Sequence, residues 1–506
     1  MANLLFWKKP HSVLLEELRS DNRLRRVLGP VQLSSLGVGA IIGTGIFVLV
    51  GVAAHDNTGP ALMLSFVASG LTCFFAALCY AEFASMVPVA GSAYTYAYAT
   101  MGELFAWIIG WDLILEYAVA SSTVAHGWSH YFQDFLLYFH VKLPHIFTNA
   151  PFDFFPDTGK LALTGTWMDL PAIAITVLVT IILVKGIQES ASVNAAIVIL
   201  KVSIVLFVIA VGSYYVKPAN WHPFAPFGFS GLTFFGHTIA GQTGPGGQPV
   251  GMLAGAAIVF FAYIGFDSVS THAEEARNPS RDVPLGIMVS LILCTILYIA
   301  MAAVLTGMVP YSRIDIDAPV SQAFLQVGLP WAQFLVSVGA ILGITSVLLV
   351  MMLSQSRVFL AMARDGLLPP GFFAAVHERF RTPWKSTILT GFCVATMAAF
   401  LPLRILADLV NIGTLLAFVI VCGAVLIMRR THPEVPRPFR APFSPLTPVL
   451  GILSCLTLMF SLPVANWIRL AVWLAIGLVI YSSYGRKHGL AVRSTNAAPE
   501  EKIVSR

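Results

Sequence analysis

Glycines are concentrated in one apolar stretch near the start of the chain, GVGAIIGTGIFVLVG, residues 37–51. At its centre lies the triplet Gly43-Thr44-Gly45. An interior glycine weakens a helix by about 1 kcal/mol relative to alanine, so this triplet favours local unwinding. Close helix packing through small residues is the alternative, and it accounts for the spacing of Gly39 and Gly43 but not for the triplet. We therefore expect a broken helix here, with free backbone amides around the triplet.

A second weak point lies in AGAAIVFFAYIGFDSVSTHAEEARNPSRDVPLG, residues 254–286, where Gly265 is followed by Phe266 and the charged Asp267. A broken helix leaves free amides at one half-helix end and free carbonyls at the other. Free amides bind a carboxylate, whereas free carbonyls bind an ammonium group. Two such breaks suit a zwitterion that carries both groups on one carbon, which is an α-amino acid.

Lys201 stands in the apolar run NAAIVILKVSIVLFVI. An ionisable side chain in such a run is costly to place in a bilayer and is a candidate for function. The alternative is that its long stem lets the ammonium group reach the membrane surface. Because removal from water favours the neutral form of an amine, a buried Lys201 could bind and release a proton.

Asp112 and Glu116, in WDLILEYAV, are four residues apart and share one helix face. We expect that face to point inward, because a lipid-exposed carboxylate is prohibitively costly. Glu116 could accept a proton, neutralise a cationic substrate, or be a structural carboxyl group. The same alternatives hold for Asp267.

The elements that must position these side chains follow from composition. Of the 506 residues, 57% are hydrophobic and 11% are charged, against about 25% charged in soluble proteins. A membrane-spanning helix needs about 20 mostly apolar residues, and only helices satisfy their own backbone in lipid without closing a barrel. The segments that qualify are residues 32–54, 61–87, 104–128, 169–187, 193–216, 251–273, 284–309, 331–361, 385–401, 405–429, 446–462 and 467–484. The sequence predicts an all-α integral membrane protein with 12 transmembrane helices.

Most lysines and arginines fall on one side of this arrangement. Cytoplasmic loops carry an excess of these residues, so both termini are expected in the cytoplasm and the protein in the plasma (inner) membrane. The N-terminal sequence lacks the apolar core of a cleaved signal peptide. The expected divisions are a cytoplasmic segment 1–30, helices 1–5 in 31–216, an extracellular loop 217–250, helices 6–10 in 251–430, helices 11–12 in 431–485 and a cytoplasmic tail 486–506.

Other classes of protein have little support in the sequence. No HExxH motif, serine–histidine pairing, nucleotide-binding loop or His/Cys metal set occurs near the apolar segments, which argues against a membrane enzyme and predicts neither cofactor nor metal. A channel would require repeated polar positions along a pore. The six cysteines lie within apolar runs, and the net charge of +5 predicts no nucleic-acid partner.

Four stretches, in order, resemble the amino acid–polyamine–organocation superfamily, and within it the cationic amino acid transporter family and its bacterial relatives. They are GVGAIIGTGIFVLVG, FFAYIGFDSVSTHAEEARNPSRDVPLGI, ARDGLLP (363–369) and VPRPFRAPFSPLTPVLGI (435–452). The resemblance, over residues 25–485, implies a leucine-transporter-like fold. In that fold a 5+5 inverted repeat has broken helices 1 and 6, and two further helices follow. It also implies amino-acid uptake, often coupled to protons.

The same resemblance implies roles for individual residues. It places the substrate carboxylate at the amides of Gly43, Thr44 and Gly45. It places the α-ammonium group at carbonyls near Ile41 and at those of Phe261 and Ile264. Lys201 is similar to a lysine that stands where sodium binds in sodium-coupled relatives. We therefore expect proton symport, with a proton-independent exchanger or facilitator as the alternative.

Met351, by resemblance, lies where substrate side chains point, although a lone methionine on an apolar helix is more often part of the core. If it faces the substrate, its bulk favours a small neutral amino acid such as alanine over a cationic one. Tyr298 is a possible hydrogen-bonding partner of the carboxylates and is grouped with Lys201, Glu116 and Asp267 in proton coupling. A small accessory transmembrane subunit would leave no trace in this sequence.

Overall fold

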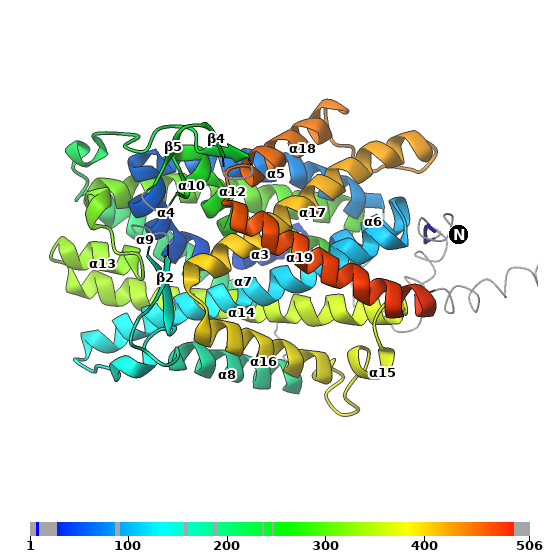
Figure 1. Ribbon diagram of the computed structural model, residues 1–506, viewed down its shortest axis with the longest axis horizontal. Helices are drawn as coiled ribbons and strands as arrows, with labels where there is room; N and C mark the ends of the chain where they lie inside the picture. The colour runs from blue at the N-terminus through cyan, green and yellow to red at the C-terminus, as the bar shows by residue number, and fades with distance from the viewer. Residues whose placement is uncertain are drawn as a thin grey trace, which may run out of the picture.

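The computed structural model describes residues 7–9, 28–86, 92–155, 160–186, 191–234, 237–244 and 247–489. Most of the predicted cytoplasmic segment 1–30 and most of the predicted tail 486–506 lie outside these ranges. Helices dominate the described chain, and many of the long ones run along the longest axis of the molecule (Figure 1).

Each of the twelve predicted apolar segments is helical in the structure. The first five correspond to α3 (Pro30–Ile41) with Gly45–Leu49 and α4 (Val50–Ala53), α5 (Leu62–Met86), α7 (Glu103–Tyr138), α8 (Leu170–Lys185) and α9 (Ala191–Ser213). The next five correspond to α10 (Met252–Val259) with a 3₁₀ turn at Phe260–Tyr263 and α11 (Ser268–Thr271), α12 (Pro279–Met308), α14 (Pro330–Arg364), α16 (Trp384–Phe400) and α17 (Leu403–Thr431). The last two are α18 (Leu446–Met459) and α19 (Val464–Ile480).

Eight helical stretches of the described chain are long and apolar enough to cross a membrane. Shorter apolar helices occupy Pro30–Ile41, Leu170–Lys185 and Leu446–Met459. The structure therefore has the membrane-protein character that the composition indicates, while the total of twelve spans stays a prediction.

Local sequence explains where several helices begin. Proline is tolerated in the first helical turn, where its missing amide would have no partner, and Pro30, Pro279 and Pro330 each occupy the first position of a helix. At the start of α8 the side chain of Asp169 accepts a hydrogen bond from the Ala172 amide at 3.1 Å. The starts of α3, α8, α12 and α14 are thus determined by local sequence.

The long helices pack in pairs that relate the two halves of the chain. α5 packs most extensively on α12, α7 on α14, and α8 on α16. α19 covers α7 from outside this group, where the Trp111 and Trp473 rings stack at 4.5 Å and each indole donates to the other residue's carbonyl. The core thus lies between helices that are far apart in sequence.

Some elements differ from the sequence-based expectation. The connection between the predicted segments 104–128 and 169–187 and the predicted loop 217–250 contain short antiparallel strands. These are β1 (Phe152–Phe155) with β2 (Lys160–Leu163), β3 (Leu232–Phe234) with β4 (His237–Ala240), and β5 (Gln242–Thr243) with β6 (Pro249–Val250). Two unpredicted short helices, α6 (Ser92–Thr100) and α13 (Pro319–Gln326), also occur. α13 and β2 lie toward the opposite end of the molecule from α6 (Figure 1).

Candidate functional site

The first helix is interrupted at the glycine–threonine–glycine triplet. α3 ends at Ile41, and the next helical turn begins at Gly45. Within the described chain the amides of Gly43, Thr44 and Gly45 donate no hydrogen bond. The Thr44 hydroxyl is also buried without a hydrogen-bond partner. Three consecutive free amides at the start of a helical turn form an anion-binding arrangement.

The second interruption follows the 3₁₀ turn Phe260–Tyr263. Gly265 has φ +118°, a conformation that L side chains rarely adopt. The Phe261 carbonyl accepts from the Ile264 amide at 3.1 Å. The Ile264 carbonyl accepts no hydrogen bond from any residue in the described ranges. A buried carbonyl with no partner is free to accept one from a ligand.

The two interruptions lie against each other. A Cβ atom added at Gly45 would lie closer than 3.0 Å to the Ala262 backbone, and one added at Gly265 would lie 2.9 Å from the Ala40 carbonyl oxygen. Backbone approaches backbone at both crossings, so neither glycine can take a side chain without movement of the opposite helix. The free amides of the first break and the free carbonyl of the second therefore belong to one buried region.

The Tyr298 hydroxyl of α12 joins the two breaks. It lies 2.8 Å from the Ile41 carbonyl oxygen and 3.0 Å from the Ala262 carbonyl oxygen, and Tyr298 itself is fully buried. The sequence suggests the carboxylates as hydrogen-bonding partners of this tyrosine, but its hydroxyl contacts the backbone carbonyls at the breaks. Its single proton stabilises carbonyl groups that the interrupted helices leave without an amide partner.

Lys201 reaches the first break from α9. Its Nζ donates to the Gly39 carbonyl at 2.6 Å and to the Ile42 carbonyl at 3.1 Å, and the side chain is 1% exposed. The ammonium group therefore does not extend to the membrane surface. The structure places no acidic side chain of the described ranges in an ion pair with it.

The three intramembrane carboxyl groups named in the sequence analysis lie on α7 and at the second break. Asp267 accepts a hydrogen bond from the Tyr117 hydroxyl of α7 at 3.0 Å. Glu116 precedes Tyr117 on α7, and its buried Oε2 has no hydrogen-bond partner in the described chain. Asp112 packs against the backbone of α17, where a Cβ at Gly413 would lie 2.8 Å from its Oδ1. All three are buried, and the inward face that the sequence predicts for Asp112 and Glu116 is observed.

Met351 is on the face of α14 that approaches the first break. Val347, one helical turn before it, lies so near Gly43 that a Cβ there would be 2.7 Å from the valine Cγ2. Residues four apart lie on the same helix face. Met351 is 2% exposed. It thus stands one turn from the residue that touches the glycine triplet.

Two residues at the breaks were missed by the sequence analysis. The Tyr131 hydroxyl donates to the Phe47 carbonyl at 2.6 Å. The Asn411 side chain donates to the Ala257 and Ile258 carbonyls at 2.8 and 3.1 Å. Both supply hydrogen bonds to carbonyls at or beside the interrupted segments. The detectable signal for Asn411 was an amide side chain inside the apolar run 405–429.

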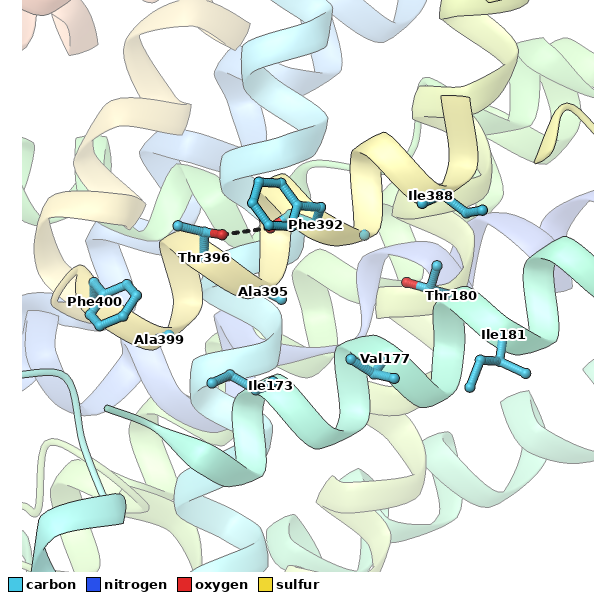
Figure 2. Close-up of a pocket in the computed structure, with 11 residues that line it drawn as sticks. Ile173, Val177, Thr180, Ile181, Ile388, Phe392, Ala395, Thr396, Ala399 and Phe400 are labelled. Atoms are coloured by element: carbon cyan, nitrogen blue, oxygen red, sulfur yellow. Dashed lines mark hydrogen bonds between the residues drawn. The ribbon is translucent and has the colours of Figure 1, made fainter. Parts of the chain in front are cut away.

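An apolar groove between α8 and α16 is a different feature. It has a volume of about 420 Å³, and Figure 2 shows its lining of mostly apolar side chains from these two helices. Phe392 is 70% exposed and Ile181 48% exposed, so the groove faces outward. No residue of the two breaks lines it. It is not the buried region described above.

Comparison of the sequence with those of known proteins assigns the chain to a family. The sequence profile described as "Amino acid permease" matches residues 28–481. The chain belongs to the amino acid permease family. The permease is 47% identical to the "Branched-chain amino acid permease BcaP" of Bacillus subtilis (strain 168) over 489 residues, which cover 96% of this chain and 99% of that protein.

Other relatives of the permease carry different names. It is 46% identical over 486 residues to the "Methylthioribose transporter" of Bacillus subtilis (strain 168), covering 96% of this chain and 99% of that protein. It is 38% identical to the "Cationic amino acid transporter 4, vacuolar" of Arabidopsis thaliana, covering 86% of this chain and 68% of that protein. These relatives are transporters and permeases, not enzymes, and they confirm the family resemblance found in the sequence.

Proposed function

We propose that this permease is a secondary active transporter that imports neutral α-amino acids together with protons. The observation that carries the proposal is the contact between the two helix breaks. Free amides at Gly43, Thr44 and Gly45 lie in the same buried region as the free carbonyl of Ile264. A carboxylate and an ammonium group on one carbon complement these two sets of backbone groups.

The proposed pose places the substrate carboxylate on the triplet amides and its ammonium group on the carbonyls of the second break. Ile264 offers a carbonyl without a partner, whereas those of Phe261 and Ile41 already accept one hydrogen bond each. A carbonyl oxygen has two lone pairs, so Phe261 and Ile41 can still accept a second bond from the substrate. The buried Thr44 hydroxyl adds a further polar group beside the carboxylate.

The substrate side chain is proposed to extend toward Met351. Its thioether limits the length of the pocket and offers no partner for a charged group, which favours alanine-like substrates. Because one relative is named a branched-chain amino acid permease, the proposal includes larger neutral amino acids such as leucine. Cationic amino acids are the alternative, for which the unpartnered Oε2 of Glu116 would be the counter-charge.

Proton coupling is proposed to depend on Lys201. Its Nζ is buried, has two carbonyl partners and has no acidic partner within the described chain, and it is the group proposed to bind and release the coupling proton. Glu116 and Asp267 are the other groups proposed to exchange protons, with Tyr298 linking the two breaks. An exchanger or facilitator that needs no proton is the alternative mechanism.

The proposed architecture is the 5+5 inverted repeat followed by two helices. The pairing of α5 with α12, α7 with α14 and α8 with α16 supports it, because each pair joins equivalent positions of the two halves. We place the protein in the plasma membrane with both termini in the cytoplasm, as the distribution of lysine and arginine indicates.

The substrate assignment is tested by counterflow of labelled alanine in proteoliposomes. Unlabelled leucine, arginine, lysine and methylthioribose compete in turn. In the parent protein, unlabelled neutral amino acids should compete with labelled alanine. In Met351→Ser, longer substrates such as arginine and lysine should compete as well. Met352→Ser is the matched control, because the next residue along α14 is equally buried but points about 100° away.

Competition by methylthioribose without competition by any amino acid would contradict the substrate class. An unchanged competition profile in Met351→Ser would remove this methionine from the pocket. A profile changed equally by Met352→Ser would show that the effect comes from altered packing of α14.

A further inference from the structure

A cluster of buried polar side chains lies away from the two breaks, where α7 meets the start of α8. His126 and His130 are four residues apart on α7 and therefore share a face. Asp169 caps α8 beside them. The three residues are 2%, 8% and 0% exposed, and the imidazole rings lie 4.7 Å apart.

Asp169 is held in a fixed orientation. Its Oδ1 accepts hydrogen bonds from the Ser129 hydroxyl at 2.5 Å and from the Ala172 amide at 3.1 Å. Its Oδ2 then lies 2.9 Å from His126 Nδ1. Both atoms are buried, and neither has a hydrogen-bond partner in the described chain, since this short contact is not aligned as a hydrogen bond.

His130 makes the same kind of contact on its other side. Its Nδ1 lies 2.9 Å from Asp317 Oδ1, in the connection before α13, and this nitrogen is also buried without an aligned partner. The Asp317 side chain is 55% exposed. The cluster is thus enclosed by α7 and α8 but reaches the surface of the molecule through Asp317.

We propose that His126, His130 and Asp169 form a binding site for a divalent transition-metal ion such as Zn²⁺. One ligand atom from each residue lies within 4.8 Å of the others. Two ligand atoms that share an ion with bonds of about 2.1 Å stand about 3.0–3.4 Å apart. The contact between His126 and Asp169 is already near this spacing, so closure requires movement mainly of the His130 ring, the least buried of the three.

The donor types determine which ion suits the site. Imidazole nitrogens with one carboxylate oxygen are typical ligands of zinc, whereas calcium and magnesium select oxygen ligands. With both imidazoles in the neutral form that metal ligation requires, the two carboxylates carry a charge of −2 that a divalent ion would neutralise. Asp317 can serve as the fourth ligand or as the hydrogen-bonding partner that orients His130. A bound ion would join α7, α8 and the connection before α13.

Retention of Zn²⁺ by the purified full-length protein tests the site. The protein is treated with a chelator, incubated with Zn²⁺ and desalted, and bound zinc and melting temperature are measured. The parent protein should retain one equivalent and melt at a higher temperature with Zn²⁺, but not with Ca²⁺ or Mg²⁺. His126→Gln, His130→Gln and Asp169→Asn should each weaken Zn²⁺ binding at least tenfold.

The matched control is His145→Gln, an exposed histidine in the connection between α7 and α8, which should bind Zn²⁺ as the parent does. Asp317→Asn changes an exposed residue, so it should fold even if a variant of a buried residue does not. It should also weaken Zn²⁺ binding. Absence of stoichiometric zinc from the parent, or equal retention by His126→Gln and the control, would overturn the proposal. No transport is measured, so the outcome is independent of the proposed function.

Discussion

Lys201 can lose a proton and still keep both of its hydrogen bonds. Its two carbonyl contacts, with Gly39 and Ile42, need only two N–H donors. A neutral amine has two such donors and an ammonium group has three. Proton loss can therefore leave both contacts intact, which is the property we propose for a coupling group in this position.

The glycine triplet gives a prediction at the same scale. Gly43→Ala should weaken stabilisation by alanine, because the new Cβ would lie 2.7 Å from Val347 Cγ2, and Val347→Ala should restore it. Gly45→Ala should lose ligand stabilisation and should not be restored in this way, because its Cβ would meet the Ala262 backbone. Thermal shift with and without alanine measures both effects.

Gly423→Ala on α17 is the matched control, since no atom lies within 4 Å of the added Cβ. It should bind alanine normally. Full alanine-induced stabilisation of Gly45→Ala would argue against the triplet as the carboxylate site. Failure of Val347→Ala to rescue Gly43→Ala would assign the defect to the backbone.

At the residue scale the sequence was informative where a residue type conflicts with its surroundings. Lys201 and Glu116 stand out as charges in apolar runs, and the triplet as a cluster of helix-weakening residues. Tyr131 gave no such signal, because tyrosine is common in apolar helices and its role depends on the partner across the fold. The use of the Tyr298 hydroxyl at both breaks likewise depends on tertiary packing.

At the scale of elements, each interrupted helix is stabilised by side chains from its neighbours. Tyr298→Phe tests this, since it keeps the ring but removes the hydroxyl beside the Ile41 and Ala262 carbonyls. The variant should lose about 1 kcal/mol of stability. It should also bind alanine more weakly, because the two breaks lose a shared contact. Unfolding in denaturing detergent and thermal shift measure the two effects.

Tyr214→Phe is the control, because that tyrosine is 88% exposed and should tolerate the change. If Tyr298→Phe binds alanine as the parent does, the hydroxyl is not needed to hold the breaks in their binding arrangement. A loss of stability equal to that of the control would remove its structural role as well.

The lengths of elements were less predictable than their existence. The apolar pattern predicted a helix ending near residue 128, but α7 continues to Tyr138. The extension is stabilised by Asp134, which accepts hydrogen bonds from Gln322, Gln333 and the Ser337 hydroxyl. A buried carboxylate with partners elsewhere in the chain carries no periodic signal. The short β-hairpins of the loops were missed because their strands are only two to four residues long, too short for a clear alternating pattern.

At the scale of the whole molecule, long helices of the first half of the chain pack against long helices of the second half. α3 and α10 are each interrupted, and their interruptions touch. In the inverted repeat that we propose, this arrangement places one binding region between two halves that can move relative to each other. The helical content and membrane character followed from composition, whereas the touching of the breaks required the structure.

Labelled-alanine uptake into proteoliposomes with an imposed pH gradient tests the central claim most directly. The parent should accumulate alanine when the outside is more acidic and should lose accumulation with an uncoupler, while a sodium gradient should have no effect. Lys201→Met should lose gradient-driven accumulation, and the exposed control Lys217→Met should keep it. Sodium-driven or uncoupler-resistant accumulation by the parent, or full accumulation by Lys201→Met, would contradict the account.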